Sequence, residues 1–302
     1  AASDVYKRQA LLIATKSNRF AYYLTRAAVF KKSLISKILM SLQMLPVYRI
    51  RDGWSNLTNN NEIFETCTEL LHNNELVVIF PEGSHNLVRR VRPLSKGFTR
   101  IVFETLERYP ETDLQLVPVG LNFVKATKYP DSTSMYFGKP IEAKAYLKNN
   151  KNEAIVSLKH DVHSAISKLT THIPADNYDE TLKKLDNLNV DYLNPNEVND
   201  CIENNFLKCE PKLKPSLGGL RFSFKALLIV NVLPAYLIWK FVVQSKVKEA
   251  EFLSTFRFAI ALTLVPLWLV LVSIIVALTF GLQYALVYFV GSLIIALLAV
   301  KV

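Results

Sequence analysis

The stretch Leu76-Val77-Val78-Ile79-Phe80-Pro81-Glu82-Gly83 is the strongest indication of how this chain folds. Consecutive aliphatic residues predict a strand buried on both faces, which is typical of a parallel sheet in an α/β domain. Pro81 ends the strand, Glu82 supplies a carboxylate, and Gly83 allows a close backbone approach. Ligands of open α/β sheets bind beyond the carboxyl ends of the strands, so we expect a binding site here. An ordinary turn with a solvated glutamate is the competing interpretation.

Apolar residues on both sides of this stretch predict alternating strands and helices. We expect strands at 20–25, 76–79, 114–123 and 135–137, and helices within 34–42, 63–71, 98–106 and 155–169. This order favours an α/β fold with a mainly parallel sheet covered by helices.

Four segments resemble three motif blocks of a known family. Residues 80–85 (Phe-Pro-Glu-Gly-Ser-His) and 93–98 (Pro-Leu-Ser-Lys-Gly-Phe) resemble the third block of the glycerolipid acyltransferases, which use glycerol-3-phosphate or lysophosphatidate. Residues 117–120 (Val-Pro-Val-Gly) resemble the fourth block, and residues 46–49 (Pro-Val-Tyr-Arg) the second. The blocks follow the family's order across residues 10–145. The Ser84-His85 variant is similar to the branch that acylates glycerol-3-phosphate or dihydroxyacetone phosphate.

The family's catalytic motif, His-x-x-x-x-Asp, is missing. The residues in its register are Asp4 and Gln9, and none of the five histidines has an aspartate five positions later. The resemblance implies that the histidine is the general base, that the aspartate fixes its tautomer, and that the acyl group moves without an acyl-enzyme. We expect residues 1–9 to be a foreign or artefactual leader on an incomplete chain. True loss of the motif is the alternative. As written, the chain lacks its base and is expected to be inactive.

The remaining blocks indicate how an acceptor is held. Arg49 could bind a phosphate through two parallel hydrogen bonds. Glu82 could accept from an acceptor hydroxyl, and the amide of Gly83 could donate to an oxyanion or phosphate. The other candidates are Ser84 and Lys96, with weaker roles for Arg51, His85 and Pro118.

Each of these roles has a simpler alternative. The basic run after Glu82, namely Arg89, Arg90, Arg92 and Lys96, suggests a pocket for an anionic substrate, but surface solvation is the alternative for Arg51, Arg89 and Arg90. Arg49 could instead form a structural salt bridge. A solvated or packed role is favoured for His160, His163 and His172.

Composition narrows the class of protein. A formal charge of +10 in a chain that is 50% hydrophobic suits an enzyme that lies on anionic lipid and uses anionic substrates. A generically basic surface is the alternative. No zinc spacing, helix-turn-helix or aromatic-basic signature points to nucleic acid as a partner. We expect neither a metal nor a cofactor. Cys67, Cys201 and Cys209 are odd in number and scattered, which favours a reducing compartment without a disulfide framework.

The carboxyl-terminal part is strongly apolar. Residues 258–300 contain no Asp, Glu, Lys, Arg or His, and about twenty apolar residues span a bilayer. We expect a transmembrane helical hairpin, 258–280 and 282–300, that turns at Gly281. A buried hairpin of a soluble protein is the alternative. Residues 226–243 carry Asn231, Pro234 and Lys240, and we expect an interfacial or re-entrant element there.

These segments give an expected organisation. The leader 1–9 precedes an acyltransferase domain at 10–174, a polar helical connector at 175–219 and a membrane region at 220–302. Basic residues precede the hairpin and its tip carries no charge, so the catalytic domain is expected on the cytoplasmic side of a multi-pass membrane protein, in a bacterial inner membrane.

The expected function is transfer of a fatty acyl group in phospholipid biosynthesis. The donor would be acyl-CoA or acyl carrier protein. The acceptor would be glycerol-3-phosphate, dihydroxyacetone phosphate or a lysophospholipid such as lysophosphatidate. Two alternatives remain open. One is a membrane-anchored lipid-binding pseudoenzyme, which the missing motif favours. The other is a phosphoester hydrolase that uses Glu82, but no metal cluster or Ser/Cys–His arrangement accompanies it.

Overall fold

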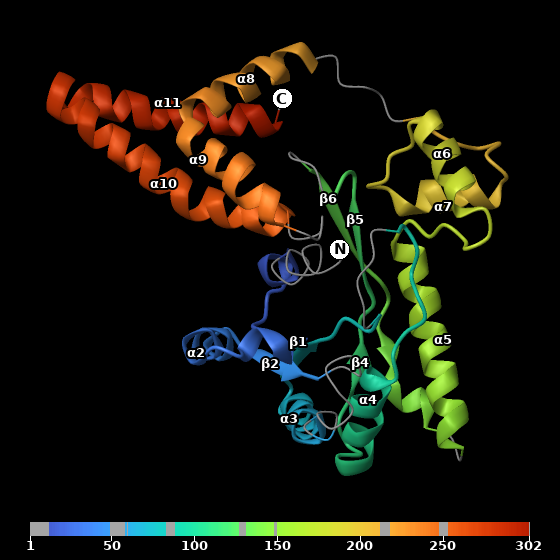
Figure 1. Cartoon of the computed structure of the whole chain (residues 1–302). Helices are drawn as coiled ribbons and strands as arrows, with labels where there is room; N and C mark the ends of the chain where they lie inside the picture. Colours follow the sequence, from blue (N-terminus) through green and yellow to red (C-terminus); the bar gives the residue numbers. More distant parts are fainter. Residues whose placement is uncertain are drawn as a thin grey trace. The chain divides into compact units, whose positions relative to one another are not determined.

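A computed structural model describes residues 12–48, 58, 60–82, 88–126, 131–147, 150–211, 218–247 and 253–301 (Figure 1). The chain divides into two compact units. The first, here called the sheet unit, comprises Arg8–Val124 and Thr133–Glu210. The second, here called the apolar unit, comprises Pro211–Val302 with the short segments Ala1–Lys7 and Lys125–Ser132.

The sheet unit begins with a three-stranded parallel sheet. Its middle strand is β1 (Ala21–Arg26), with β2 (Met44–Val47) on one side and β3 (Leu76–Val78) on the other. Tyr23 is paired with Met44 of β2 and with Val78 of β3. Because all three strands are parallel, their carboxyl ends meet at one edge, and Glu82 follows β3 there.

Helices connect these strands as the spacing of apolar residues predicts. The 3₁₀ helix η1 (Ala27–Phe30) and α2 (Ser33–Ser41) join β1 to β2, and α3 (Asn60–His72) joins β2 to β3. The predicted strand at 76–79 is confirmed, but β3 is half-buried rather than buried on both faces. Among the described residues it lies at an edge of the three-stranded sheet and pairs only with β1.

The later strands pair antiparallel. β4 (Gln115–Leu116) pairs with β7 (Ile141–Glu142), and β5 (Val119–Phe123) pairs with β6 (Thr133–Phe137). The strand at 114–123 was expected to be broken by Pro118 and Gly120. It is interrupted at Pro118, which has no N–H to donate, but Gly120 lies within β5. The parallel arrangement holds for the first sheet, and the short antiparallel pairs extend the fold beyond it.

Two helices build the main core against these strands. They are α4 (Gly97–Arg108) and α5 (Lys151–Leu169), and a short 3₁₀ helix, η4 (Ala143–Tyr146), precedes α5. Asn150 caps α5, because its side chain accepts from the N–H groups of Asn152 and Glu153. At Gly120 a Cβ would come within 2.2 Å of the carbonyl oxygen of Leu169, so only glycine allows α5 to end against β5. The core residues include Leu94, Phe98, Val102, Phe103, Leu106, Leu114, Ala143, Leu158 and Val162.

Residues 173–210, most of which were expected as part of the connector 175–219, contain a small core of their own. The helices α6 (Tyr178–Leu188) and α7 (Pro195–Glu203) enclose the fully buried side chains of Ile173 and Leu185 together with Val190, Tyr192 and Val198. This part of the chain is therefore packed by its own apolar residues.

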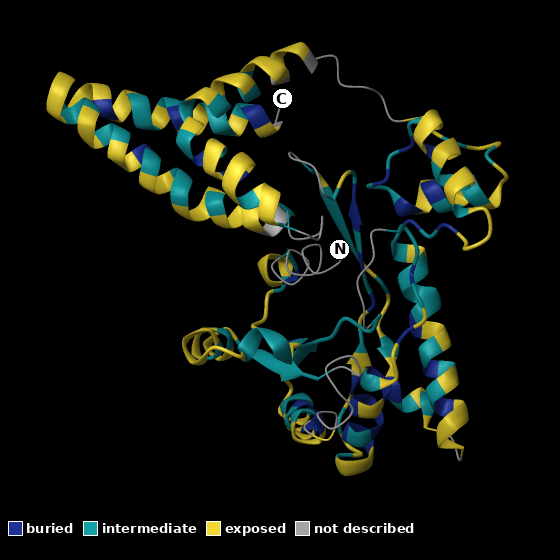
Figure 2. Cartoon of the chain, in the orientation of Figure 1, coloured by how far each residue is buried: buried dark blue, intermediate teal, exposed yellow. Residues whose placement is uncertain are grey.

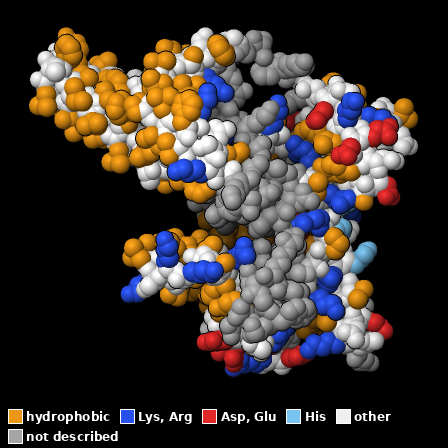
Figure 3. Space-filling model, viewed as in Figure 1, with side chains coloured by type: hydrophobic (Ala, Val, Ile, Leu, Met, Phe, Trp, Pro, Cys, Tyr) orange, Lys and Arg blue, Asp and Glu red, His pale blue; other side chains and the backbone are white. Residues whose placement is uncertain are grey.

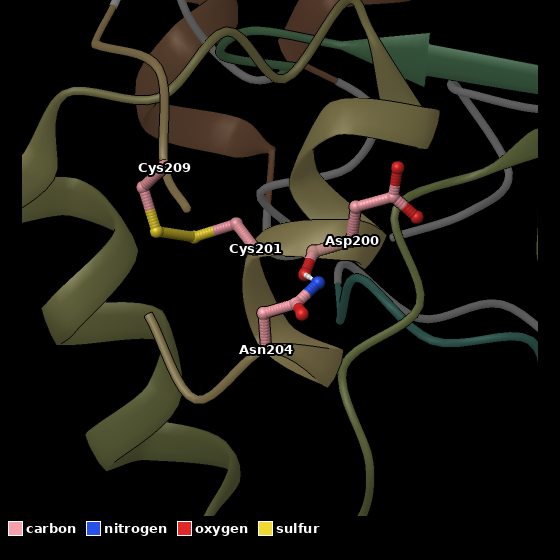
Figure 4. The surroundings of a disulfide bond; sticks show 4 residues. All are labelled: Asp200, Cys201, Asn204 and Cys209. Atoms are coloured by element: carbon pink, nitrogen blue, oxygen red, sulfur yellow. Dashed lines mark hydrogen bonds between the residues drawn. A yellow bond between two sulfur atoms is a disulfide. The ribbon is translucent and has the colours of Figure 1, made fainter. Parts of the chain in front are cut away.

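A disulfide joins Cys201 to Cys209, with 4.8 Å between their Cα atoms (Figure 4). The expectation that this pair forms no disulfide was wrong. The chain turns back after α7 through Asn205 and Phe206, which both have positive φ, and this turn brings the two cysteines together. Cys67 is a buried free thiol, and burial raises its pKa to about 12.

The apolar unit is helical. It contains α8 (Gly218–Asn231), α9 (Leu233–Leu237), a π-helical segment η5 (Ile238–Val243), a 3₁₀ turn η6 (Gln244–Lys246), α10 (Leu253–Phe280) and α11 (Leu282–Lys301). Phe256–Phe280 and Leu282–Val300 are long and apolar enough to cross a membrane. Between them Gly281 has a φ of +103°, which glycine tolerates. The predicted hairpin of two apolar helices is confirmed.

A bend and a polar contact distinguish the start of this unit. Phe222–Asn231 and Leu233–Lys246 meet at 96°, as a broken span or a re-entrant loop would. At the bend, the indole N–H of Trp268 donates to the carbonyl of Asn231 (2.9 Å), and the Tyr288 hydroxyl donates to Asn231 Oδ1 (2.8 Å). Asn231 thus ties α8 to both α10 and α11. Next to it lies a cavity of about 220 Å³, lined by Pro234, Ala235, Ile238, Leu264, Leu267, Trp268 and Leu271.

Candidate active site

Glu82 lies at the carboxyl edge of the parallel sheet, held by the segment that precedes α4. The backbone N–H of Ser95 donates to the carbonyl of Pro81 (2.7 Å). The backbone N–H of Arg92 donates to Glu82 Oε1 (3.4 Å), and the Arg92 guanidinium lies 3.8 Å from Oε2. Both side chains are largely buried, with 23% of Glu82 and 19% of Arg92 exposed. The two halves of the third motif block are therefore adjacent, and the carboxylate of Glu82 has a fixed direction.

The same edge carries the ends of β1 and β2. Arg26 is the last residue of β1, and its side chain is exposed. After β2, the buried side chain of Asn60 fixes Tyr48: it accepts from the Tyr48 N–H and donates to the Tyr48 carbonyl, both at 2.8 Å. This fixes the backbone directly before Arg49, the phosphate-binding candidate.

Some of the predicted site residues lie outside the part of the chain that the structure describes, and others lie within it. Arg49, Arg51, Gly83, Ser84 and His85, and the motif-register positions Asp4 and Gln9, lie outside the described residues. Lys96 is exposed directly before α4, and its carbonyl accepts from the Thr99 hydroxyl (2.9 Å). Pro118 is buried, and its carbonyl accepts from the N–H of Gly138 (2.8 Å), which is a structural contact.

Arg89 has a structural role that its position in the basic run does not predict. Its guanidinium donates to the carbonyls of Phe123 and Val124, both at 2.8 Å, and lies 3.6 Å from the centre of the Tyr192 ring. Neither anion binding nor surface solvation describes it. The end of β5 leaves carbonyl groups that need donors, and Arg89 supplies them.

The backbone of 89–91 is held by the residues that follow α5. The N–H of Ile173 donates to the carbonyl of Arg89 (2.8 Å), and the N–H of Arg89 donates to the Tyr178 hydroxyl (2.8 Å). The N–H of Val91 donates to His172 Nδ1 (3.1 Å). Arg92, which contacts Glu82, directly follows Val91 in the chain. The residues between α5 and α7 therefore support the segment that positions Glu82.

His163 and His172 form a packed pair on this support. Their rings meet edge to face with centroids 5.9 Å apart, and His163 Nε2 lies 3.3 Å from the carbonyl oxygen of Val91. Burial, with smaller contributions from His163 and Arg90, lowers the pKa of His172. Neutral His172 can accept at Nδ1 while its proton is on Nε2. The expected packed role is what these two histidines have.

Sequence reasoning missed Arg26, Asn60 and the specific role of Arg92. A signal for Arg26 was present, since it ends an apolar strand just as Glu82 follows one, and parallel strands end at one edge. Nothing local marks Asn60 or Arg92, whose partners come from other segments. In the part of the chain that the structure describes, no group of three His, Cys, Asp or Glu residues could hold a metal ion.

The comparison with protein families covers this region. Residues 3–122 match the family model described as Acyltransferase. This stretch is therefore similar to acyltransferase domains. It includes the parallel sheet, α4 and most of β5, so the resemblance stated from the motif blocks is confirmed.

Curated relatives agree with this identification. An uncharacterized acyltransferase of Schizosaccharomyces pombe is 26% identical over 103 residues, which is 32% of this chain and 15% of the relative. Glycerol-3-phosphate O-acyltransferases 1 and 2 of Saccharomyces cerevisiae are 24% and 23% identical, over 36% and 38% of this chain and 15% and 16% of their own lengths. The chain thus spans only a small part of each relative. No solved structure is significantly similar to the chain.

Proposed function

We propose that this chain uses its acyltransferase domain to acylate a hydroxyl of a phosphorylated glycerol in glycerolipid synthesis. The acceptor would be glycerol-3-phosphate, dihydroxyacetone phosphate or lysophosphatidate, and the donor a thioester, acyl-CoA or acyl carrier protein. The observation that carries the proposal is the fixed carboxylate of Glu82 at the sheet edge, inside the matched stretch. The names of the two Saccharomyces relatives favour glycerol-3-phosphate.

Each residue at this edge would bind a different part of the acceptor. Glu82 Oε1 accepts from the Arg92 N–H, and a carboxylate, which accepts several hydrogen bonds at once, would also accept from an acceptor hydroxyl. Arg49, with Arg51, would bind the phosphate, supported by Tyr48 and Asn60. The Gly83 amide would donate to an oxyanion or phosphate, and Lys96 would add positive charge. Glu82 therefore orients the acceptor and does not serve as the base.

A base is needed because an alcohol is a poor nucleophile at neutral pH. We expect the chain as written to be inactive, since the positions in register are Asp4 and Gln9. The double variant Asp4→His/Gln9→Asp should gain on the order of 10²–10⁴-fold in turnover. Asp4→His alone is the matched control and should gain less, because no carboxylate fixes its tautomer. Comparable turnover without the substitutions would place the base elsewhere.

Acceptor binding can be tested without turnover. Titration calorimetry with glycerol-3-phosphate should show a loss of roughly one to two decades in affinity for Arg49→Ala, since a charge-assisted contact is worth about 1.5–3 kcal/mol. Arg49→Lys should recover part of this. Arg108→Ala is the control, because Arg108 pairs with Glu65 at the far end of α4.

The same titration separates the alternatives. Binding without any gain on restoring the motif would favour the pseudoenzyme. An equal loss for Arg49→Ala and Arg108→Ala would return Arg49 to a structural role. In a restored chain that turns over, Arg49→Ala should raise the acceptor KM far more than the donor KM.

We also propose that the apolar unit anchors a multi-pass protein whose acyltransferase domain faces the cytoplasm, in a bacterial inner membrane. The two apolar helices support this, and the basic residues before α10 favour the orientation. Deleting 258–302 should move much of the protein to the soluble fraction and leave salt-sensitive binding. Retention through high salt and alkaline wash would point to 226–243 as the anchor.

A further inference from the structure

The helix α2 exposes its apolar residues. The spacing of 34–42 places large apolar side chains on one helical face, as a packed helix would, yet none of the nine residues of α2 is buried. The exposed side chains are Leu34 (72%), Ile35 (42%), Ile38 (52%) and Met40 (55%), followed by Leu42 (52%). A helix of a water-soluble domain normally turns such a face inwards.

The sequence around α2 is basic. Lys31 and Lys32 directly precede the helix, Lys37 lies within it, and all three are exposed. From residue 5 to residue 51 the sequence contains no Asp or Glu. Figure 3 shows hydrophobic and Lys or Arg side chains mixed over α2. An apolar face beside clustered lysines is the pattern of helices that lie in a lipid headgroup region.

The topology relates this surface to the candidate active site. The segment with η1 and α2 leads from the carboxyl end of β1 to the amino end of β2. The first residues of α2 therefore lie towards the carboxyl edge of the sheet, where Glu82 follows β3. A flat partner that contacts Lys31, Lys32 and the start of α2 would therefore lie beside the carboxyl edge of the sheet, where the candidate site is.

We propose that α2 docks the sheet unit on the surface of an anionic lipid bilayer, with Leu34 and Ile38 inserted among the acyl chains and the lysines among the phosphates. The stretch 5–51, which has no Asp or Glu, fits anionic lipid by charge complementarity. The chain also carries two helices of membrane-spanning length, which would keep the sheet unit close to a bilayer. This docking is separate from acyl transfer and does not depend on it.

Insertion can be measured on the full chain in vesicles. A polarity-sensitive fluorophore on Ile38→Cys should shift to the blue in vesicles that contain phosphatidylglycerol, and spin-labelled acyl chains should quench it. Val156→Cys on α5, 67% exposed in the same unit, is the matched control and should report water in all vesicles. Native cysteines interfere little, since Cys67 is buried and Cys201 is joined to Cys209.

The charge dependence provides a second readout. Each lysine at a lipid surface contributes about fivefold to partitioning. Lys31→Gln/Lys32→Gln should therefore weaken insertion at position 38. The amount of anionic lipid needed to give the same fluorescence signal should rise by up to about 25-fold. Because α2 buries no residue, Leu34→Ser in the labelled Ile38→Cys protein should leave the fold intact by circular dichroism and weaken the insertion signal, which tests the apolar face.

Three results would overturn the proposal. The first is a probe at position 38 that reports water as fully as the one at position 156 in anionic vesicles. The second is a signal that does not respond to anionic lipid or to loss of the lysines. The third is shielding of position 38 in detergent with cross-links between copies, which would assign the face to a second copy of the chain. None of these readouts requires catalytic turnover, so failure of docking and failure of the proposed activity are distinguishable.

Discussion

The helices α4 and α10 are both rich in large apolar residues, but they place them in opposite ways (Figure 2). In α4, Phe98, Ile101, Phe103 and Leu106 are at most 4% exposed. In α10, Leu262 is 65%, Leu267 67% and Leu278 82% exposed. The difference is one of solvent, because water forces α4 to bury its apolar stripe and a bilayer can cover α10 directly. The helix α2 belongs to the sheet unit, but it exposes its large apolar side chains to the same extent as helices of the apolar unit do.

The largest expected effect comes from truncating one large apolar side chain in each of these two settings. Phe103→Ala should cost about 3–5 kcal/mol, because it removes a 3% exposed ring from the core of α4. Leu278→Ala removes contacts that lipid can replace, so it should cost less than about 1 kcal/mol. Thermal unfolding of the chain in lipid nanodiscs, followed by circular dichroism, measures both. Similar losses at the two positions would mean that the exposed face of α10 is packed against protein.

Much of this contrast could be predicted from the sequence, because it depends on local patterns. The strand before Glu82, the helix 98–106 and the hairpin 258–300 follow from apolar runs and spacing, and all are confirmed. The spacing at 34–42 correctly placed a helix. It could not show whether anything covers the apolar face, because spacing records which residues share a face and not what lies opposite.

The candidate site shows the same limit of local reasoning. Glu82 was identified because a motif and a strand end coincide. The role of Arg89 depends on the carbonyls of Phe123 and Val124, which are distant in the sequence. The disulfide depends on a turn after α7 that no spacing rule indicated. Arg49, Gly83 and Ser84 stay predictions, since they lie outside the described residues.

A smaller effect should separate polar contacts in the two units. Tyr288 donates to Asn231 Oδ1 in the apolar unit (2.8 Å), and Tyr136 donates to the carbonyl of Leu193 in the sheet unit (3.0 Å). Tyr136→Phe should cost about 0.5–1.5 kcal/mol. Tyr288→Phe should cost about 0.6 kcal/mol, near the average for hydrogen bonds between membrane helices. Thermal unfolding in nanodiscs compares the two, and a cost above about 2 kcal/mol for Tyr288→Phe would assign the bend at Asn231 a larger share of the stability than a single contact provides.

The smallest effect is a pH dependence confined to the sheet unit, since the sequence after residue 210 contains no histidine. Burial, His163 and Arg90 lower the pKa of His172 below its ordinary value of 6.5, so the folded protein keeps this ring neutral where the unfolded chain takes up a proton. Stability from this group is therefore complete above about pH 6.5 and is lost as the pH falls from there towards the lowered pKa of the folded state.

Protonated Nδ1 could no longer accept from the N–H of Val91, so the segment that positions Arg92 and Glu82 should loosen first. Amide hydrogen exchange at Val91 measured on both sides of pH 6.5 reports this loosening. His172→Asn offers an acceptor that does not titrate, and it should flatten the pH dependence of exchange at Val91 while α10 and α11 exchange as before. An unchanged pH dependence in His172→Asn would show that another group controls the segment.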